Sequence, residues 1–129
     1  MSQGERAGGE RLFSVEDANA ELARLRELLP RIREAREGLI AASGRIEDAV
    51  ATDGGGVAGS DWFAHQQALK AGIEELATRG ILLRDPEMGL VDFPAERDGE
   101  RVFLCWRLGE DAVAHFHGER GGYARRKPL

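Results

Sequence analysis

Residues 76–83, Leu-Ala-Thr-Arg-Gly-Ile-Leu-Leu, contain the point where the sequence pattern of this chain changes from helical to extended. Before Gly80, apolar residues recur at helical spacing, and after it they form short runs separated by turn residues. Glycine is favoured just after the last turn of a helix because it adopts a left-handed backbone conformation without a steric penalty. The pattern therefore predicts an α+β fold, in which a long antiparallel helical hairpin precedes a small antiparallel β meander.

The first helix of the hairpin is predicted to run from about Ser14 to Thr52. Ser14 and Asp17 have the spacing of a capping box, which supplies hydrogen bonds to the first turn of a helix. Residues 53–56, Asp-Gly-Gly-Gly, cannot sustain the helix and should end it. Because Pro30 lacks a backbone N–H, we expect it to kink the helix or to divide it just before this residue.

Apolar residues along the first helix are spaced by alternating steps of four and three, as in a coiled coil that packs along one narrow seam. Arg36 and Ser43 interrupt the seam. The first helix is also longer than the second, which leaves part of the seam for the β segment or a second subunit. We therefore expect a homodimer or docking to a partner helix. The seam consists of Ala18, Leu22, Leu25, Leu29, Ile32, Arg36, Leu39, Ser43, Ile46 and Val50.

The second helix is predicted from about Asp61 to Arg79, with this aspartate or the serine before it as N-cap. The preceding residues 53–60 are interpreted as a flexible connector, because they join two helices and lack the Gly-Lys-Ser/Thr ending of a phosphate-binding loop. Residues 1–12 repeat Gly-Glu-Arg and have almost nothing to bury. We expect them to be a disordered lead into a single domain of residues 13–129.

The β meander is predicted within residues 81–117, where short apolar runs alternate with turns. Asp-Gly at residues 98–99 is typical of a hairpin turn, and Pro94 is expected to end the strand that contains it. Residues 118–129 have no hydrophobic pattern of their own and are predicted to be a tail. The predicted strands cover residues 81–83, 90–93, 101–106 and 112–117.

The composition limits the classes of function. A formal net charge of −5 argues against a large nucleic-acid interface, and the three consecutive cations at residues 125–127 neutralise too few phosphates. No apolar stretch approaches the ~18 residues of a membrane span, and the N-terminus lacks the apolar core of a signal peptide. The single cysteine, Cys105, excludes an intramolecular disulfide. We expect a cytoplasmic protein with neither nucleic-acid nor membrane partners.

The best candidate site is the triplet His115-Phe116-His117 in the last predicted strand. Residues two apart on a strand project to the same face, so both imidazoles could reach one metal ion. Imidazole favours zinc, nickel, copper or iron over magnesium or calcium. The alternative is that two partly exposed histidines flank a core phenylalanine at a sheet edge. Nearby acidic and sulfur side chains that could complete a metal site are Asp92, Glu96, Cys105 and Glu110.

The register of the last two strands decides which of these side chains can meet. If four residues form the turn, His115 shares a face with Leu104 and Trp106, and Cys105 lies on the opposite face. If five residues form it, Cys105 pairs directly with His115. The sequence leaves both registers open.

Asp92 and Cys105 also have structural interpretations. A carboxylate in an apolar strand is costly when buried and unpaired, so we expect Asp92 to form an ion pair with Arg101 or Arg107. A cysteine between leucine and tryptophan is most often a small buried apolar group. A reactive thiolate would need a cationic neighbour.

A family resemblance is carried by residues 13–19, 89–95, 99, 102–110, 117 and 126–129. Together these segments resemble a bacterial family of uncharacterised proteins, the domain of unknown function 2203. The resemblance implies membership over nearly the whole chain, but it brings no activity, substrate or cofactor. It gives His117 more weight than His115, because family members often have Trp-His where this chain has Phe116-His117.

Two functions follow from these patterns. The first is a divalent-metal-binding protein, with zinc, nickel or iron held by a small His and carboxylate site in the C-terminal β segment. The alternative is a helical-hairpin interaction module without catalytic activity. Neither pattern predicts a particular reaction, so enzymatic activity stays open. The predicted metal ligands are His115, His117, Glu110, Asp92 and Cys105.

Overall fold

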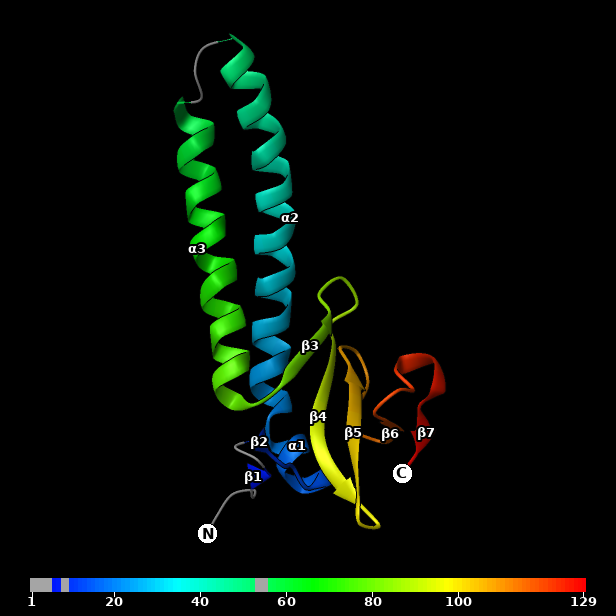
Figure 1. Cartoon of the computed structure of the whole chain (residues 1–129). Helices are drawn as coiled ribbons and strands as arrows, with labels where there is room; N and C mark the ends of the chain where they lie inside the picture. Colours follow the sequence, from blue (N-terminus) through cyan, green and yellow to red (C-terminus); the bar gives the residue numbers. More distant parts are fainter. Residues whose placement is uncertain (1–5, 8–9, 53–55) are drawn as a thin grey trace.

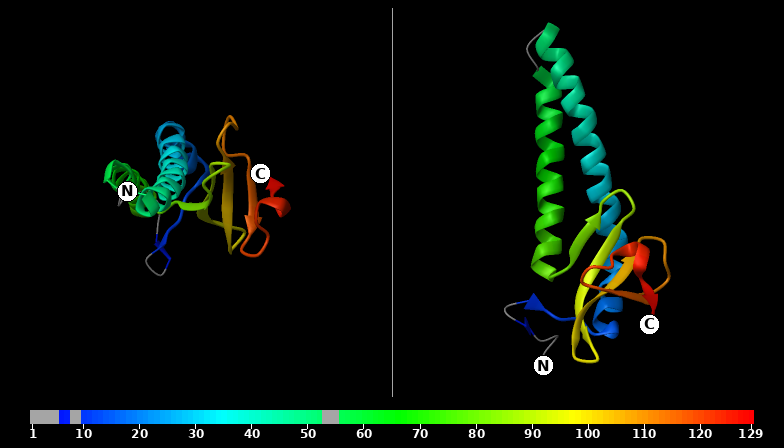
Figure 2. Two further views of the ribbon diagram at one scale, coloured as in Figure 1. Left: turned by 90° about the horizontal axis from the view of Figure 1, so that it is seen from above. Right: turned by 45° about the vertical axis from the view of Figure 1, so that its right-hand side comes forward.

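The structure is a computed structural model that describes residues 6–7, 10–52 and 56–129. Two long helices pack side by side, and the base of this hairpin lies against one face of a five-stranded antiparallel sheet, while part of the C-terminal segment lies on the other side of that sheet (Figures 1 and 2). The predicted α+β class, with a helical hairpin followed by antiparallel strands, is confirmed.

The N-terminal helical stretch is divided near its start and continuous afterwards. α1 (Val15–Ala20) begins with the predicted capping box, in which the Asp17 N–H donates to Ser14 Oγ at 2.9 Å. The break falls at Glu21, whose N–H donates to the Ala18 carbonyl in a tighter turn. α2 (Leu22–Thr52) then passes through Pro30 without interruption, so of the two outcomes expected at this proline, a kink or a division, the division does not occur. The surrounding helix is long enough to tolerate one missing N–H.

α3 (Gly56–Arg79) begins five residues earlier than predicted and pairs antiparallel with α2 (Figure 1). Helix propensity is a weak prior, and here it does not prevent a Gly-containing first turn. Of the predicted connector, residues 53–55 lie outside the described residues. Gly80 follows α3 with φ +79°, which confirms its predicted role after the helix.

The N-terminal lead differs from the prediction of disorder where it is described. β1 (Arg6–Ala7) and β2 (Glu10–Arg11) form a two-stranded hairpin. The Glu10 carboxylate forms an ion pair with Arg101, and Arg11 donates to the Arg79 carbonyl at 3.0 Å. These contacts with the folded body order residues that bury little apolar surface. Residues 1–5 and 8–9 of the predicted lead lie outside the described residues.

The sheet is a meander extended by the C-terminal segment, in the order β3-β4-β5-β6-β7. β4 continues through Pro94, whose predicted role as a strand end is wrong. Pro94 lies beyond the end of β3, and its carbonyl accepts from the Phe13 N–H at 2.7 Å, so its nitrogen faces away from β5 and no ladder hydrogen bond is lost. The strands are β3 (Leu82–Asp85), β4 (Leu90–Arg97), β5 (Glu100–Arg107), β6 (His115–Gly118) and β7 (Lys127–Pro128).

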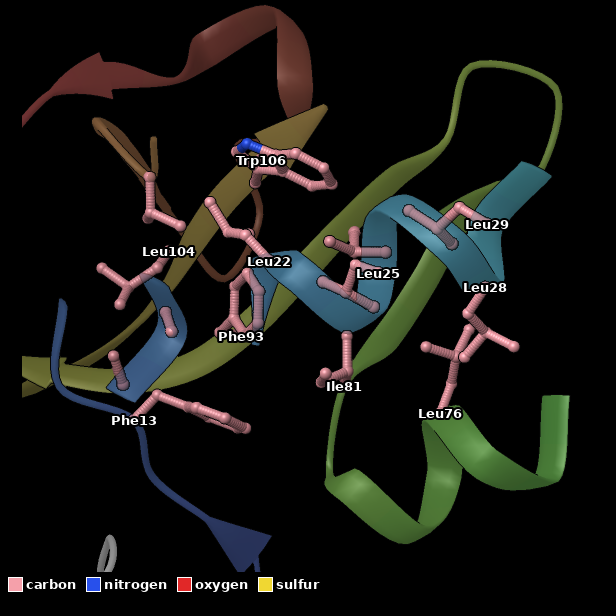
Figure 3. Packing of buried hydrophobic residues seen from close by; sticks show 14 of the residues in the cluster. Phe13, Leu22, Leu25, Leu28, Leu29, Leu76, Ile81, Phe93, Leu104 and Trp106 are labelled. Carbon is pink, nitrogen blue, oxygen red and sulfur yellow. The ribbon is translucent and has the colours of Figure 1, made fainter. Parts of the chain in front are cut away.

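The two faces of the sheet have different chemistry. On the inner face, Phe93 and Trp106 are fully buried and pack with Leu22 and Leu25 of α2 (Figure 3). Because successive strand residues alternate between faces, the residues next to them, Asp92 and Cys105, point to the outer face. Part of the predicted tail, residues 119–126 with a 3₁₀ turn at Tyr123–Arg125, lies over that face, and β7 extends the sheet beside β6 (Figure 2). This three-layer arrangement buries polar side chains beneath the C-terminal segment.

The hairpin extends well beyond the sheet (Figure 1). Near the sheet, the seam residues Leu25, Leu29 and Ile32 are buried in the core. Farther out, Ile40 of α2 and Phe63 of α3 are 58% and 56% exposed. Among the described helices, none combines the length and the apolarity that crossing a membrane requires.

Candidate metal centre

Three buried polar side chains meet on the outer face of the sheet, one each from β4, β5 and β6. They are Asp92, Cys105 and His117, and one potential ligand atom from each lies within 4.8 Å of the other two. Asp92 and Cys105 occupy directly opposed positions of neighbouring strands. His117 is opposite Phe103 and reaches Asp92 diagonally over β5. The group offers an oxygen, a sulfur and a nitrogen ligand, a donor set that suits zinc and other transition metals.

His117 is held through both ring nitrogens. Its Nε2 lies 2.9 Å from Oδ2 of Asp92. Its Nδ1 lies 2.7 Å from the Gly118 carbonyl oxygen and 3.2 Å from the Gly122 nitrogen. When Nδ1 carries the proton it can donate to the Gly118 carbonyl, and when it does not it can accept from the Gly122 N–H. Either tautomer therefore has a hydrogen bond that fixes the orientation of the ring. Such hydrogen bonds around a ligating histidine fix its direction.

Asp92 has one satisfied and one unsatisfied oxygen. Oδ2 accepts from Arg84 Nε at 2.8 Å as well as facing His117. Oδ1 is buried and has no hydrogen-bond partner among the described residues. A buried acceptor without a partner costs roughly 1–3 kcal/mol, more when it is charged. The structure thus leaves an anionic lone pair in the group of three with nothing to bind it.

Cys105 is fully buried between the other two side chains. Burial raises the pKa of its thiol to about 11, the Asp92 charge adds to the rise, and Arg126 partly opposes it. Without a metal the thiol is therefore neutral at pH 7. A metal ion at this position would displace the thiol proton, as ligation requires a thiolate.

The other predicted ligands lie outside this group. Cys105 pairs directly with His115, which is the register of the five-residue turn. The Nδ1 of His115 is nevertheless buried without a described partner, and neither ring nitrogen belongs to the group of three. Glu110 accepts from Arg126 at 3.1 and 2.5 Å, and this arginine lowers the pKa of the Glu110 carboxyl. Glu96 is exposed.

Arg84 is the site residue that sequence reasoning missed. Asp92 pairs with Arg84 and His117 instead of the expected Arg101 or Arg107. β3 has a register shift between Leu83 and Asp85, which places the intervening arginine beside Asp92. A bulge of this kind leaves no clear signature in a short apolar strand.

A cavity of about 300 Å³ lies against the buried group. Asp92 and His117 line it together with residues 119–123 of the C-terminal segment. A Cβ atom on Gly121 would lie 3.3 Å from the Cβ of His117, so glycine allows this wall to approach the histidine closely. The cavity gives the buried group a route for a metal ion or a small ligand. Its lining is Arg84, Leu90, Asp92, His117, Glu119, Arg120, Gly121, Gly122 and Tyr123.

Comparison with known proteins gives one match. The model of a family described as "Uncharacterized conserved protein (DUF2203)" matches residues 11–129, which confirms the resemblance seen in the sequence. No curated protein and no solved structure matches the chain.

Proposed function

The chain belongs to the uncharacterised DUF2203 family, and from this premise we propose that it binds a divalent transition metal through Asp92, Cys105 and His117. Membership brings no activity, so the proposal depends on the site. The observation that carries it is Oδ1 of Asp92, a buried anionic oxygen without a described partner, grouped with a thiol and an imidazole. A cation would satisfy this oxygen, and the other two side chains are ligands of the same kind of ion.

The donor set narrows the choice of metal. A thiolate favours zinc, iron or nickel over magnesium and calcium, which prefer oxygen ligands. Three protein ligands leave a fourth position of a tetrahedral zinc site open, the pattern of catalytic rather than structural zinc. Asp92 and His117 line the cavity, which supports a fourth position that a small ligand could reach.

Metal binding requires a small local movement. Ligand atoms around zinc stand about 3.3 Å apart when the zinc–nitrogen and zinc–oxygen bonds are ~2.0–2.1 Å in a tetrahedron. Nε2 of His117 and Oδ2 of Asp92 are 2.9 Å apart, close enough for a hydrogen bond. The two groups would separate by a few tenths of an ångström, or Asp92 would present Oδ1 instead. Arg84 would keep its bond to Oδ2 in the second arrangement.

The test is calorimetric titration of chelator-treated, tag-free protein with zinc. We expect binding of one ion per chain that is lost in His117→Ala. His115→Ala is the matched control, because it removes an imidazole from the same strand and face but outside the group of three. Equal loss in both variants would favour the predicted His115–His117 pair, and no saturable binding by the wild type would refute the metal site.

A second function is supported by the exposed end of the hairpin. We propose that two copies of the chain associate through the outer parts of α2 and α3. Two large apolar side chains, Ile40 of α2 and Phe63 of α3, are more than half exposed there. The oligomeric mass in solution tests this proposal without reference to the metal.

A further inference from the structure

We propose that the cavity beside the metal centre binds a small molecule through an oxyanion group, a carboxylate or a phosphate, held by Arg84 and Arg120. This inference rests in part on the proposed function, because a bound metal would provide the second attachment point. The two arginines line the cavity whether or not a metal is bound, so anion binding by them can be tested in metal-free protein.

The volume of the cavity sets the size of the ligand. Small-molecule pockets usually range over ~300–1,000 Å³, and this one, at about 300 Å³, is at the lower limit. A small metabolite fits this space, whereas a dinucleotide or a peptide does not.

The charges around the cavity favour an anion. The acidic groups nearby already have cationic partners: Glu119 accepts from Arg101 at 2.6 Å, and Asp92 accepts from Arg84 at 2.8 Å. By contrast, the Arg120 guanidinium forms no ion pair or hydrogen bond with any side chain that the structure describes. The cavity therefore has a cation that lacks a counter-charge.

Arg84 has donors left for a ligand. Its Nε donates to Asp92, while its two terminal nitrogens have no partner among the described residues. The side chain is 44% exposed, and the guanidinium stacks over the Phe103 ring at 5.0 Å, which fixes its plane. An oriented guanidinium presents a fork of N–H groups that matches the oxygens of a carboxylate or a phosphate. A divalent ion on the group of three would increase the attraction for the same anion.

The glycines of the cavity wall are suited to a ligand that lies against the backbone. Gly122 has φ +66°, a conformation that favours glycine, and its N–H points at His117. A Cβ on Gly121 would lie only 3.3 Å from the Cβ of this histidine, which is closer than side chains usually approach. These two positions therefore present backbone without a side chain to the cavity, which leaves room there for an oxyanion.

The test is calorimetric titration of metal-free protein with inorganic phosphate and, separately, with succinate. We expect millimolar or tighter binding of at least one anion, weakened about tenfold in Arg120→Gln through loss of a charge-assisted hydrogen bond. Arg125→Gln is the matched control, with the same charge change in the same segment but outside the cavity lining. Arg84→Lys, which keeps the charge and removes the fork, should also weaken binding. The anion that binds more tightly identifies the head group.

The outcomes separate the two proposals. Anion binding that depends on Arg120 in a protein that takes up no zinc would support the pocket and refute the metal site. Zinc uptake without binding of either anion to the metal-free or the zinc-loaded protein would refute the pocket and leave the metal site standing. Equal weakening by Arg120→Gln and Arg125→Gln would refute the assignment of this cavity, since it would reflect net charge alone.

Discussion

Asp92 and His117 belong to strands that are not neighbours, yet their side chains meet 2.9 Å apart across β5. The imidazole reaches over the intervening strand, where its ring lies against Phe103 with centroids 5.5 Å apart. Cys105, on the same strand as Phe103, is enclosed by the pair. The contact between Asp92 and His117 thus joins side chains of β4 and β6 across β5. The C-terminal segment lies over this group on the outer face of the sheet.

Zinc affinity is expected to rise with pH. Because burial raises the Cys105 pKa to about 11, the thiol is protonated throughout the neutral range, and zinc must displace its proton. Release of one proton increases the apparent affinity about tenfold per pH unit below that pKa. Calorimetry at pH 7 and 8, in buffers of different ionisation enthalpy, measures both the affinity and the protons released. An affinity that does not change with pH would show that the thiol is not a ligand.

Asp92→Ala is expected to destabilise the metal-free protein by about 3 kcal/mol. The change leaves buried His117 and partly exposed Arg84 without their shared acceptor, and breaking a buried pair by removing one partner is costly. Urea denaturation of the chelator-treated protein measures the effect. Glu96→Ala is the control, because Glu96 is exposed on the same strand and should change the free energy of unfolding by less than about 0.5 kcal/mol. Equal stabilities would contradict the buried network.

Gly121→Ala is expected to weaken zinc binding and to lower stability by about 1–3 kcal/mol, because its Cβ would press on backbone-anchored atoms of His117 and Arg125 at 3.3 Å. Gly118→Ala is the matched control: an added Cβ at Gly118 meets nothing within 4 Å. Thermal denaturation and zinc titration of both variants check this pair. If Gly118→Ala has the larger effect, the close approach of the wall to His117 is not what supports the site.

Self-association is expected through the outer hairpin. Sedimentation equilibrium of the wild type should give twice the chain mass at high concentration. The double variant Ile40→Ser, Phe63→Ser should give the monomer mass, because both side chains are exposed in the single chain. Val15→Ser is the control, since Val15 is an exposed apolar residue at the other end of the helices. A wild type that stays monomeric at every concentration would exclude the dimer.

Local sequence signals predicted most of the fold. The capping box at Ser14 and the glycine at Gly80 specify helix ends through hydrogen bonds and backbone conformation within a few residues, and both are confirmed. Prolines were less informative, because their effect depends on which neighbours surround the missing N–H. Pro30 is accommodated inside a helix, and Pro94 lies where no strand partner needs its donor.

The site was only partly predictable. Asp92, Cys105 and His117 were named from residue type, and the family resemblance favoured His117 over His115. Their meeting depends on the five-residue register, and the position of Arg84 depends on a bulge in β3. Neither feature has a local sequence signal. The sequence does not predict that the C-terminal segment lines the cavity. This segment contributes backbone and arginine side chains, and it has no apolar pattern that would indicate packing against the sheet.

X-ray absorption spectroscopy of zinc-loaded, tag-free protein tests the metal site most directly. We predict one zinc per chain with one sulfur at about 2.3 Å and nitrogen or oxygen ligands at about 2.0–2.1 Å. Cys105→Ser should remove the sulfur scattering, and His115→Ala should leave the spectrum unchanged. A zinc ion surrounded by nitrogen and oxygen alone in the wild type, or a protein that retains no zinc, would contradict the assignment of Asp92, Cys105 and His117 as its ligands.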